Sequence, residues 1–323
     1  MTDHFVARIE EILWPEGPRQ NIWMILDGAR SIEIFRMLLA CHLEYSCLYS
    51  GTLTPELEIA APYLVQLDHG YKDTHKLIER AWGNSWGVFL RSDTSLKKLR
   101  RHLREFLIVR DERGNRLAFR YYDPRVLRVY LPTCTTAELR TVFGPIECFW
   151  TDSKNPEQLL DFRFERGKLV QRTISLAAEV TRSADRPQPS DEPERISSDR
   201  PVGVLAIRQT QMEAFSRVEI RKFEDWMINH LTQFFPDYCL APGNTQLREL
   251  IQDGIKRAAG YGITTKRDVC KFIDLMIVFG RDFDRDARLT WASKLLSAKD
   301  EPFLKIRALQ TAALHHLRSL GQP

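Results

Sequence analysis

A break in composition after residue 177 constrains the fold of this chain more than any other feature of its sequence. Residues 178–204, AEVTRSADRPQPSDEPERISSDRPVGV, contain four prolines and many charges but almost no large apolar side chains. Such a segment cannot bury enough apolar surface to fold, and its composition is typical of a linker. The sequence therefore predicts two folded regions, residues 1–177 and residues 205–323, joined by a proline-rich and charge-rich linker.

Region 1–177 alternates short apolar runs with amphipathic helical patterns, which is typical of a domain with helices packed on a sheet. Runs of strand length lie in NIWMILDGAR and at residues 46–52, 61–68, 86–92, 117–122 and 146–150. LDFRFE and KLVQRTI, which are joined at Arg166–Gly167, add a hairpin. We expect a mixed α/β domain with a mixed, largely antiparallel sheet.

Region 205–323 shows only helical periodicity. One apolar stripe runs from Met212 to Leu231 and stops before Pro236, and a second, from Leu247 to Ala258, ends at Gly260. A third helix has Thr264 or Thr265 as its cap and Gly280 as its end, and two more helices follow. The predicted class of the whole chain is therefore α+β, with an all-α helical lobe after the first domain.

Net charge and the distribution of apolar residues argue against a nucleic-acid-binding, a secreted or a membrane-spanning protein. The formal charge is +4 from 47 basic and 43 acidic residues, which is too small an excess to indicate a nucleic-acid-binding protein. The beginning of the chain, MTDHFVARIEEILWPEG, lacks the apolar core of a signal peptide, and no apolar run reaches the length of a membrane span. We expect a cytoplasmic protein that does not insert into a membrane.

The cysteines predict neither a metal site nor a cofactor. Six cysteines are scattered without a CxxC pair, and the eight histidines do not fall at ligand spacing near them. Asp282, Asp284 and Asp286 resemble the opening of a calcium-binding loop. That loop also needs a glycine and a glutamate where this chain has Ala287 and Ser293, so we interpret the aspartates as turn and cap residues.

The stretch LAFRYYDPRVLRVYLP, residues 117–132, predicts a strand, a cap and a helix. Period-two alternation from residue 117 to residue 122 indicates a strand, Asp123 can cap a helix, and Pro124 suits the first helical position. Arg120 and Arg125 flank this junction. Two interpretations stay open: an Arg–Asp–Arg network that makes the turn rigid, and a recognition site for an anionic group.

Two further features could carry function. In the helix predicted at residues 94–106, Arg100, Arg101 and Arg104 lie on a basic face, which is either solvated or a patch for an acidic protein partner. Asp27 ends a strand, where it caps a loop, pairs with an arginine or acts as a catalytic carboxylate. An enzyme for an anionic substrate would need Asp27, His102 and the two arginines of the junction to converge in one cleft.

Several motifs, taken in order, resemble the type VI secretion effector adaptors, the Tap or TEC chaperones, over roughly residues 20–150. They are WMILDGA, CLYSGT, APYLV, HLR, FRYYDPRVL, LP and FGPI followed by Trp150. Positions within these motifs that we expect to be structural are Trp23, Asp27, Gly28, Tyr49, Gly51, Pro62, His102, Phe119, Asp123, Pro124, Gly144 and Pro145. Expected partner-binding residues are Arg100, Arg101, Arg104, Arg120, Tyr122 and Arg125.

The resemblance implies a role without catalysis and without a metal or cofactor. Adaptors of this kind bind a toxic effector in the cytosol and load it onto the spike protein VgrG, without being secreted themselves. The expected partners are therefore a cognate effector and the C-terminal region of the spike. Two lobes on a linker would suit a molecule that engages two partners.

Overall fold

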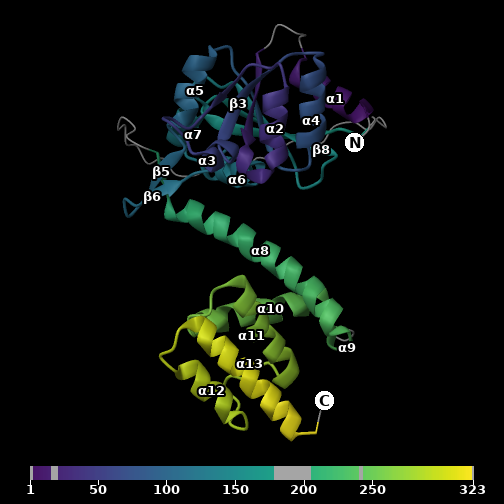
Figure 1. Cartoon of the computed structure of the whole chain (residues 1–323), viewed down its shortest axis with the longest axis vertical. Helices are drawn as coiled ribbons and strands as arrows, with labels where there is room; N and C mark the ends of the chain where they lie inside the picture. Colours follow the sequence, from purple (N-terminus) through teal and green to yellow (C-terminus); the bar gives the residue numbers. More distant parts are fainter. Residues whose placement is uncertain (1–2, 16–20, 178–204, 240–242, 322–323) are drawn as a thin grey trace. The chain divides into compact units, whose positions relative to one another are not determined.

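The computed structural model describes residues 3–15, 21–177, 205–239 and 243–321. They form two compact units, Met1–Phe215 and Ser216–Pro323 (Figure 1). The predicted linker, residues 178–204, lies outside the described residues. No helix within the described ranges has an apolar stretch long enough to cross a membrane.

The first unit is built on a seven-stranded sheet with the order β2-β3-β1-β4-β7-β8-β9. Every pairing in this sheet is antiparallel. The strands are β1 (Ile22–Asp27), β2 (Tyr45–Cys47), β3 (Pro62–Leu67), β4 (Gly87–Arg91), β7 (Cys148–Asp152), β8 (Gln158–Glu165) and β9 (Lys168–Ser175). With the helical region that follows, this sheet confirms the predicted α+β class.

Apolar cores lie on both faces of the sheet, which explains why β1 reads as a continuous apolar run. Trp23 and Ile25 of β1 pack into one core, while Met24 and Leu26 pack into the other. The core around Trp23 takes side chains from α5 (Leu96–Arg104), α6 (Pro124–Tyr130) and α7 (Thr136–Phe143). The core around Met24 takes them from α1 (Asp3–Leu13), α2 (Ile32–Ala40) and α4 (Lys72–Ala81).

Short elements complete the first unit. They are η1 (Gly28–Arg30), α3 (Pro55–Ile59) and η2 (Leu131–Thr133), together with a small sheet of β10 (Ala206–Ile207), β5 (Ile108–Asp111) and β6 (Arg116–Ala118). The strand expected at residues 117–122 was predicted too long, because β6 ends at Ala118. Phe119 donates the last cross-strand hydrogen bond, to Leu107, and a turn at residues 120–123 then buries both Tyr121 and Tyr122.

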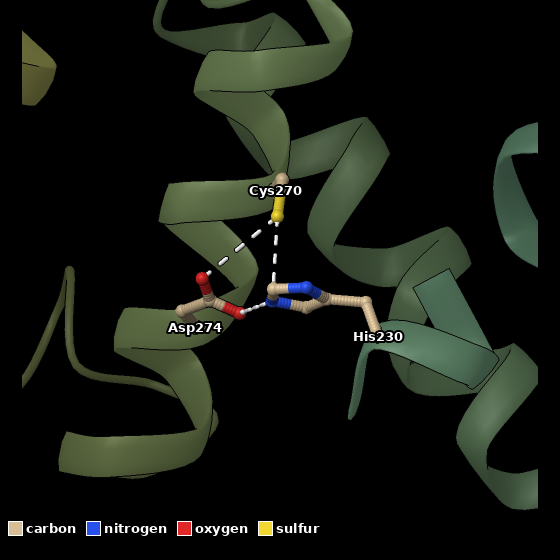
Figure 2. Close-up of side chains that lie close together, drawn as sticks. All are labelled: His230, Cys270 and Asp274. Atoms are coloured by element: carbon tan, nitrogen blue, oxygen red, sulfur yellow. Dashed lines mark hydrogen bonds and ion pairs between the residues drawn. The ribbon is translucent and has the colours of Figure 1, made fainter. Parts of the chain in front are cut away.

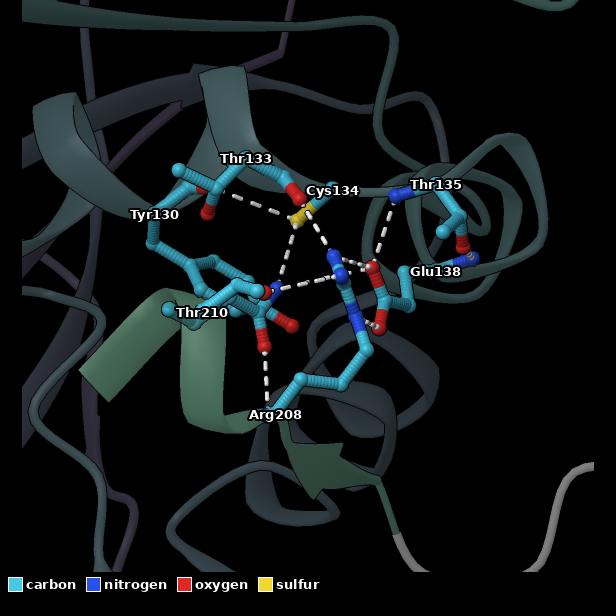
Figure 3. A network of polar contacts seen from close by, with 8 residues as sticks. Tyr130, Thr133, Cys134, Thr135, Glu138, Arg208 and Thr210 are labelled. Carbon is cyan, nitrogen blue, oxygen red and sulfur yellow. Dashed lines mark hydrogen bonds and ion pairs between the residues drawn. The ribbon is translucent and has the colours of Figure 1, made fainter. Parts of the chain in front are cut away.

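Residues 205–215, which the sequence assigned to the helical lobe, belong to the first unit. Leu205 and Ile207 are buried in the core around Trp23, and β10 pairs in parallel with β5. Arg208 then bonds to the start of α7 (Figure 3): its Nε donates to Glu138 Oε1 at 2.9 Å, and its Nη2 donates to the carbonyl of Thr133. Burial and an ion pair therefore hold this segment on the first unit.

Replacing Arg208 by alanine should loosen residues 205–215 from the first unit. The Arg208 side chain is about one-third exposed, so water screens part of its interaction with Glu138. We expect the substitution to lower the free energy that holds this segment in place by about 1–2 kcal/mol, through the loss of its charged hydrogen bonds. Faster hydrogen exchange at Leu205 and Ile207, with unchanged exchange in β1, would verify this. The control is Arg217→Ala, at an exposed position of the helix Gln209–Phe234, which follows Arg208. Equal exchange in both variants would contradict the prediction.

The second unit is helical. Its elements are α8 (Gln209–Phe234), whose first turns belong to the first unit, α9 (Pro236–Cys239), α10 (Asn244–Gly260), α11 (Lys266–Phe279), α12 (Thr290–Ser297) and α13 (Pro302–Ser319). Gly254 of α10 brings α10 and α11 together, since a Cβ there would lie 2.6 Å from Ile273. Asp284 is fully buried and bonds to Arg257 and Tyr261.

Candidate functional site

The end of β1 is the point around which the candidate site is built. Asp27 donates its backbone N–H to Trp86 at 2.7 Å, and Gly28 donates to Ala61 at 3.0 Å. A Cβ on Gly28 would lie 2.4 Å from the carbonyl oxygen of Ile59, so only glycine fits there. Backbone contacts on two sides therefore fix the end of β1, and Asp27 is buried there.

Asp27 forms an ion pair with Arg120, which lies 93 residues further along the chain. The two ends of this pair differ in environment: the Asp27 side chain is 1% exposed and that of Arg120 is 43% exposed. Burial raises the pKa of Asp27 above its ordinary value, and Arg120 only partly opposes that effect. Arg120 is 43% exposed, so water screens its charge. Its attraction therefore offsets only part of the free energy that is lost when the Asp27 carboxylate is buried.

The other two members of the predicted cluster pair with each other. Asp123 caps α6 by accepting the backbone N–H of Arg125 at 2.9 Å. The guanidinium of Arg125 then binds the same carboxylate through Nε at 2.9 Å and through Nη2 at 2.5 Å. Burial would raise the pKa of Asp123, but the bonds from Arg125 outweigh burial and lower it. This pair fixes the start of α6 and supplies the Asp123–Arg125 half of the Arg–Asp–Arg network that one interpretation proposed, whereas Arg120 pairs with Asp27.

Sequence reasoning missed a third pair at the same edge of the sheet. β7 runs parallel to β1, since both are antiparallel to β4, and like β1 it ends in a buried aspartate, Asp152. Arg128 of α6 donates to Asp152 Oδ1 at 3.1 Å. Two features of the sequence could have indicated this pair. Arg128 lies one helical turn beyond Arg125 on α6, and β1 and β7 both end in an aspartate.

A groove of about 560 Å³ opens beside the Asp27–Arg120 pair. Its lining includes Asp27, Leu48, Tyr49, Leu53, Leu57, Arg104, Ile108, Phe119, Arg120 and Tyr122. Leu57 and Ile108 are exposed although they are apolar. Most of the wall is apolar, and Arg104 and Arg120 place two cations beside it, a composition suited to a protein segment that carries both apolar and acidic side chains.

The basic face of α5 continues from this groove. A second hollow, of about 690 Å³, is lined by Lys97, Lys98, Arg101 and Arg104, and Arg104 lines both hollows. Arg100, which also lines the second hollow, donates to the carbonyls of Cys47 at 2.7 Å and Tyr49 at 3.1 Å. Arg100 therefore joins α5 to the end of β2, while Arg101 faces solvent.

His102 lies in a different place from the groove. Its Nε2 is 3.0 Å from the carbonyl oxygen of Val142, and its ring packs edge-on against Phe106. Gly144 has a φ of 47°, and a Cβ there would lie 2.4 Å from the His102 ring. Burial lowers the pKa of His102, so the imidazole is neutral at pH 7. Among the described residues that line the groove are Asp27 and Arg120, but neither His102 nor Arg125.

The remaining motif residues hold backbone in place. Trp23 donates its Nε1–H to the carbonyl of Ser92 at 3.1 Å, and the Ser92 hydroxyl donates to the carbonyl of Pro145 at 2.8 Å. Pro62 begins β3 and accepts the N–H of Leu48 at 2.8 Å. Pro124 is buried at the start of α6. Gly51, which follows β2, has a φ of 83°, a left-handed backbone conformation that glycine adopts readily.

Comparison with known proteins gives one match. The model of a domain of unknown function, DUF4123, matches residues 22–141, a range that contains the Asp27–Arg120 pair, the groove and α5 but not the helical unit. No curated protein and no solved structure matches the chain.

Proposed function

We propose that this protein is a type VI secretion effector adaptor, which binds a toxic effector and loads it onto the VgrG spike without acting as an enzyme. The observation that carries the proposal is the DUF4123 match over residues 22–141, because this domain is known in effector adaptors of that system. The motifs WMILDGA and FRYYDPR, on which the resemblance depends, supply the two partners of the Asp27–Arg120 pair.

The groove and the basic face of α5 are the proposed contact surface for one partner. Leu57 and Ile108 expose apolar surface at the groove, and covering that surface would add hydrophobic stabilisation to a complex. Arg101 and Arg104 would attract acidic side chains at the rim, which speeds association and selects the partner. The two units offer separate surfaces, which suits a protein that must hold an effector and a spike at once.

Copurification tests this proposal. The full chain is coexpressed with the toxin encoded beside it and with the C-terminal region of the spike protein. We expect both partners to copurify with the adaptor. Leu57→Asp should weaken binding of one partner roughly tenfold or more, as expected for a residue near the centre of an interface. Arg101→Glu should slow association of the same partner and so weaken binding, as expected when a charge at the rim is reversed.

Matched controls separate the groove from the rest of the surface. Leu39→Asp changes a leucine of α2 that is somewhat more exposed than Leu57, and Arg140→Glu changes an exposed arginine of α7. Neither control should alter binding. Purification of the chain with neither partner would overturn the adaptor role, whereas copurification with both partners that is unaffected by Leu57→Asp and Arg101→Glu would overturn only the proposed surface.

A further inference from the structure

Three side chains that commonly bind metals meet in the second unit (Figure 2). Cys270 and Asp274 lie four residues apart on α11 and so share one face of that helix. His230 of α8 points its ring toward them. One donor atom of each residue lies within 4.8 Å of the others. Neither the groove nor the Asp27–Arg120 pair involves this cluster.

The distances between the donor atoms suit a tetrahedral metal ion. His230 Nε2 lies 3.0 Å from Asp274 Oδ1, and Cys270 Sγ lies 3.6 Å from Nε2 and 3.8 Å from Asp274 Oδ2. Zinc bonds of about 2.0 Å to nitrogen and oxygen and about 2.3 Å to sulfur place tetrahedral ligands roughly 3.3–3.5 Å apart. Each of the three separations lies within a few tenths of an ångström of that spacing. Because Oδ1 of Asp274 faces His230 and Oδ2 faces Cys270, the carboxylate would turn to present one oxygen to the ion.

The arrangement differs from that of a catalytic Cys–His–Asp relay. In a relay the base accepts the thiol proton on one ring nitrogen while the carboxylate orients the ring through the other. Here the sulfur of Cys270 and the carboxylate of Asp274 both approach Nε2 of His230. The three groups thus converge on one point, as the ligands of a metal do.

Charge and burial also fit a metal ion. Cys270 is buried, and the side chains of His230 and Asp274 are mostly shielded from water, at 17% and 27% exposed. A divalent cation would displace the thiol proton, and its two charges would balance one thiolate and one carboxylate. Such a site would be electrically neutral at the place where Cys270 is buried.

We propose that His230 Nε2, Cys270 Sγ and the carboxylate of Asp274 form a site for a zinc-like divalent cation, with a water in the fourth position. The cation joins α8 to α11. This proposal departs from the expectation of no metal site, which rested on the spacing of ligands along the sequence. It is independent of the adaptor role.

Cobalt provides the direct test, because four-coordinate Co²⁺ bound to a thiolate absorbs light through sulfur-to-metal charge transfer. The full chain, freed of any histidine tag and treated with a chelator, is titrated with Co²⁺ and then with Zn²⁺. We expect a charge-transfer band that saturates at a single Co²⁺ per chain and disappears when Zn²⁺ is added. We also expect Zn²⁺ to raise the melting temperature of the second unit.

Variants identify the ligands. Cys270→Ser should abolish the charge-transfer band, and His230→Gln and Asp274→Asn should each weaken Co²⁺ binding roughly tenfold or more. The controls Cys239→Ser and His315→Ala should leave the band unchanged. Circular dichroism establishes that each variant is folded, and Asp274→Asn, which keeps the shape of the side chain, serves if Cys270→Ser does not fold. Absence of the band in the unmodified chain, its persistence in Cys270→Ser, or full affinity in Asp274→Asn would overturn the proposal.

Discussion

Gly87→Ala is expected to prevent the first unit from folding. Gly87 begins β4 next to β1, and a Cβ at this position would lie 1.9 Å from the carbonyl oxygen of Ile25 and 2.9 Å from its carbon. Both atoms belong to the backbone of the central strand, so no side chain can rotate away to make room. We expect the free energy of unfolding of the first unit to fall by at least about 4 kcal/mol, which is more than overpacking usually costs, because two paired strands would have to separate.

Thermal unfolding and hydrogen exchange in β1 and β3 would measure this effect. Gly260→Ala is the control, because a Cβ at the end of α10 meets no atom within 4 Å and no positive φ is required there. That control should retain the melting temperature of the unmodified chain. A Gly87→Ala protein with native exchange rates in β1 would show that the two strands are not packed as closely as described.

Arg120→Ala should have the second-largest effect, because it leaves a buried carboxylate without its cation. Removing one partner of a buried pair costs about 3–5 kcal/mol, and since Arg120 is 43% exposed we expect about 2–3 kcal/mol at neutral pH. The opposite change, Asp27→Asn, should cost less, since the half-exposed guanidinium can be hydrated. Restored stability in the Arg120→Ala/Asp27→Asn double variant would identify the stranded charge as the cause.

The same pair predicts a dependence on pH. The pKa of Asp27 is raised above its ordinary value of 3.8, so the folded state favours the protonated carboxyl. The stability due to this group is therefore full below pH 3.8 and is lost as pH rises through the higher pKa of the folded state. Without Arg120 the folded-state pKa moves still higher, so the cost of Arg120→Ala should grow with pH.

Hydrogen exchange of β1 and β4 amides at several pH values would measure this cost in the first unit alone. Arg140→Ala, at an exposed arginine of α7, is the control and should show no such dependence. A cost that is the same at every pH, or a double variant no more stable than Arg120→Ala, would contradict the stranded-charge explanation. Unchanged stability with lost partner binding would instead make Arg120 a contact residue.

Helix caps and the central strand of this protein were predictable because they depend on residues that are close together in the sequence. Asp123 caps α6 with Pro124 in its first turn, and Thr135 and Glu138, three residues apart, form a capping box at the start of α7. Thr265 caps α11, and the apolar run before Asp27 forms a strand. In each case the hydrogen-bond partner or the buried face is fixed within a few positions of the chain.

Partner choice between distant segments was not predictable in the same way. The sequence placed Arg120 beside Asp123, but the turn after Ala118 directs it to Asp27. Strand pairing decided that Asp152 would lie at the same edge of the sheet as Asp27. Likewise, β10 (Ala206–Ile207) forms as a strand by pairing with β5, which lies far from it in the sequence.

The sequence by itself determined the class of the fold, the apolar run of β1 and the cap of α6, since capping and periodicity act over one or two turns of chain. The tertiary structure decided which charges meet. An ion pair such as Arg120–Asp27, or a cluster such as His230, Cys270 and Asp274, depends on which strand ends and helix faces are brought together, and packing of the whole unit sets that arrangement.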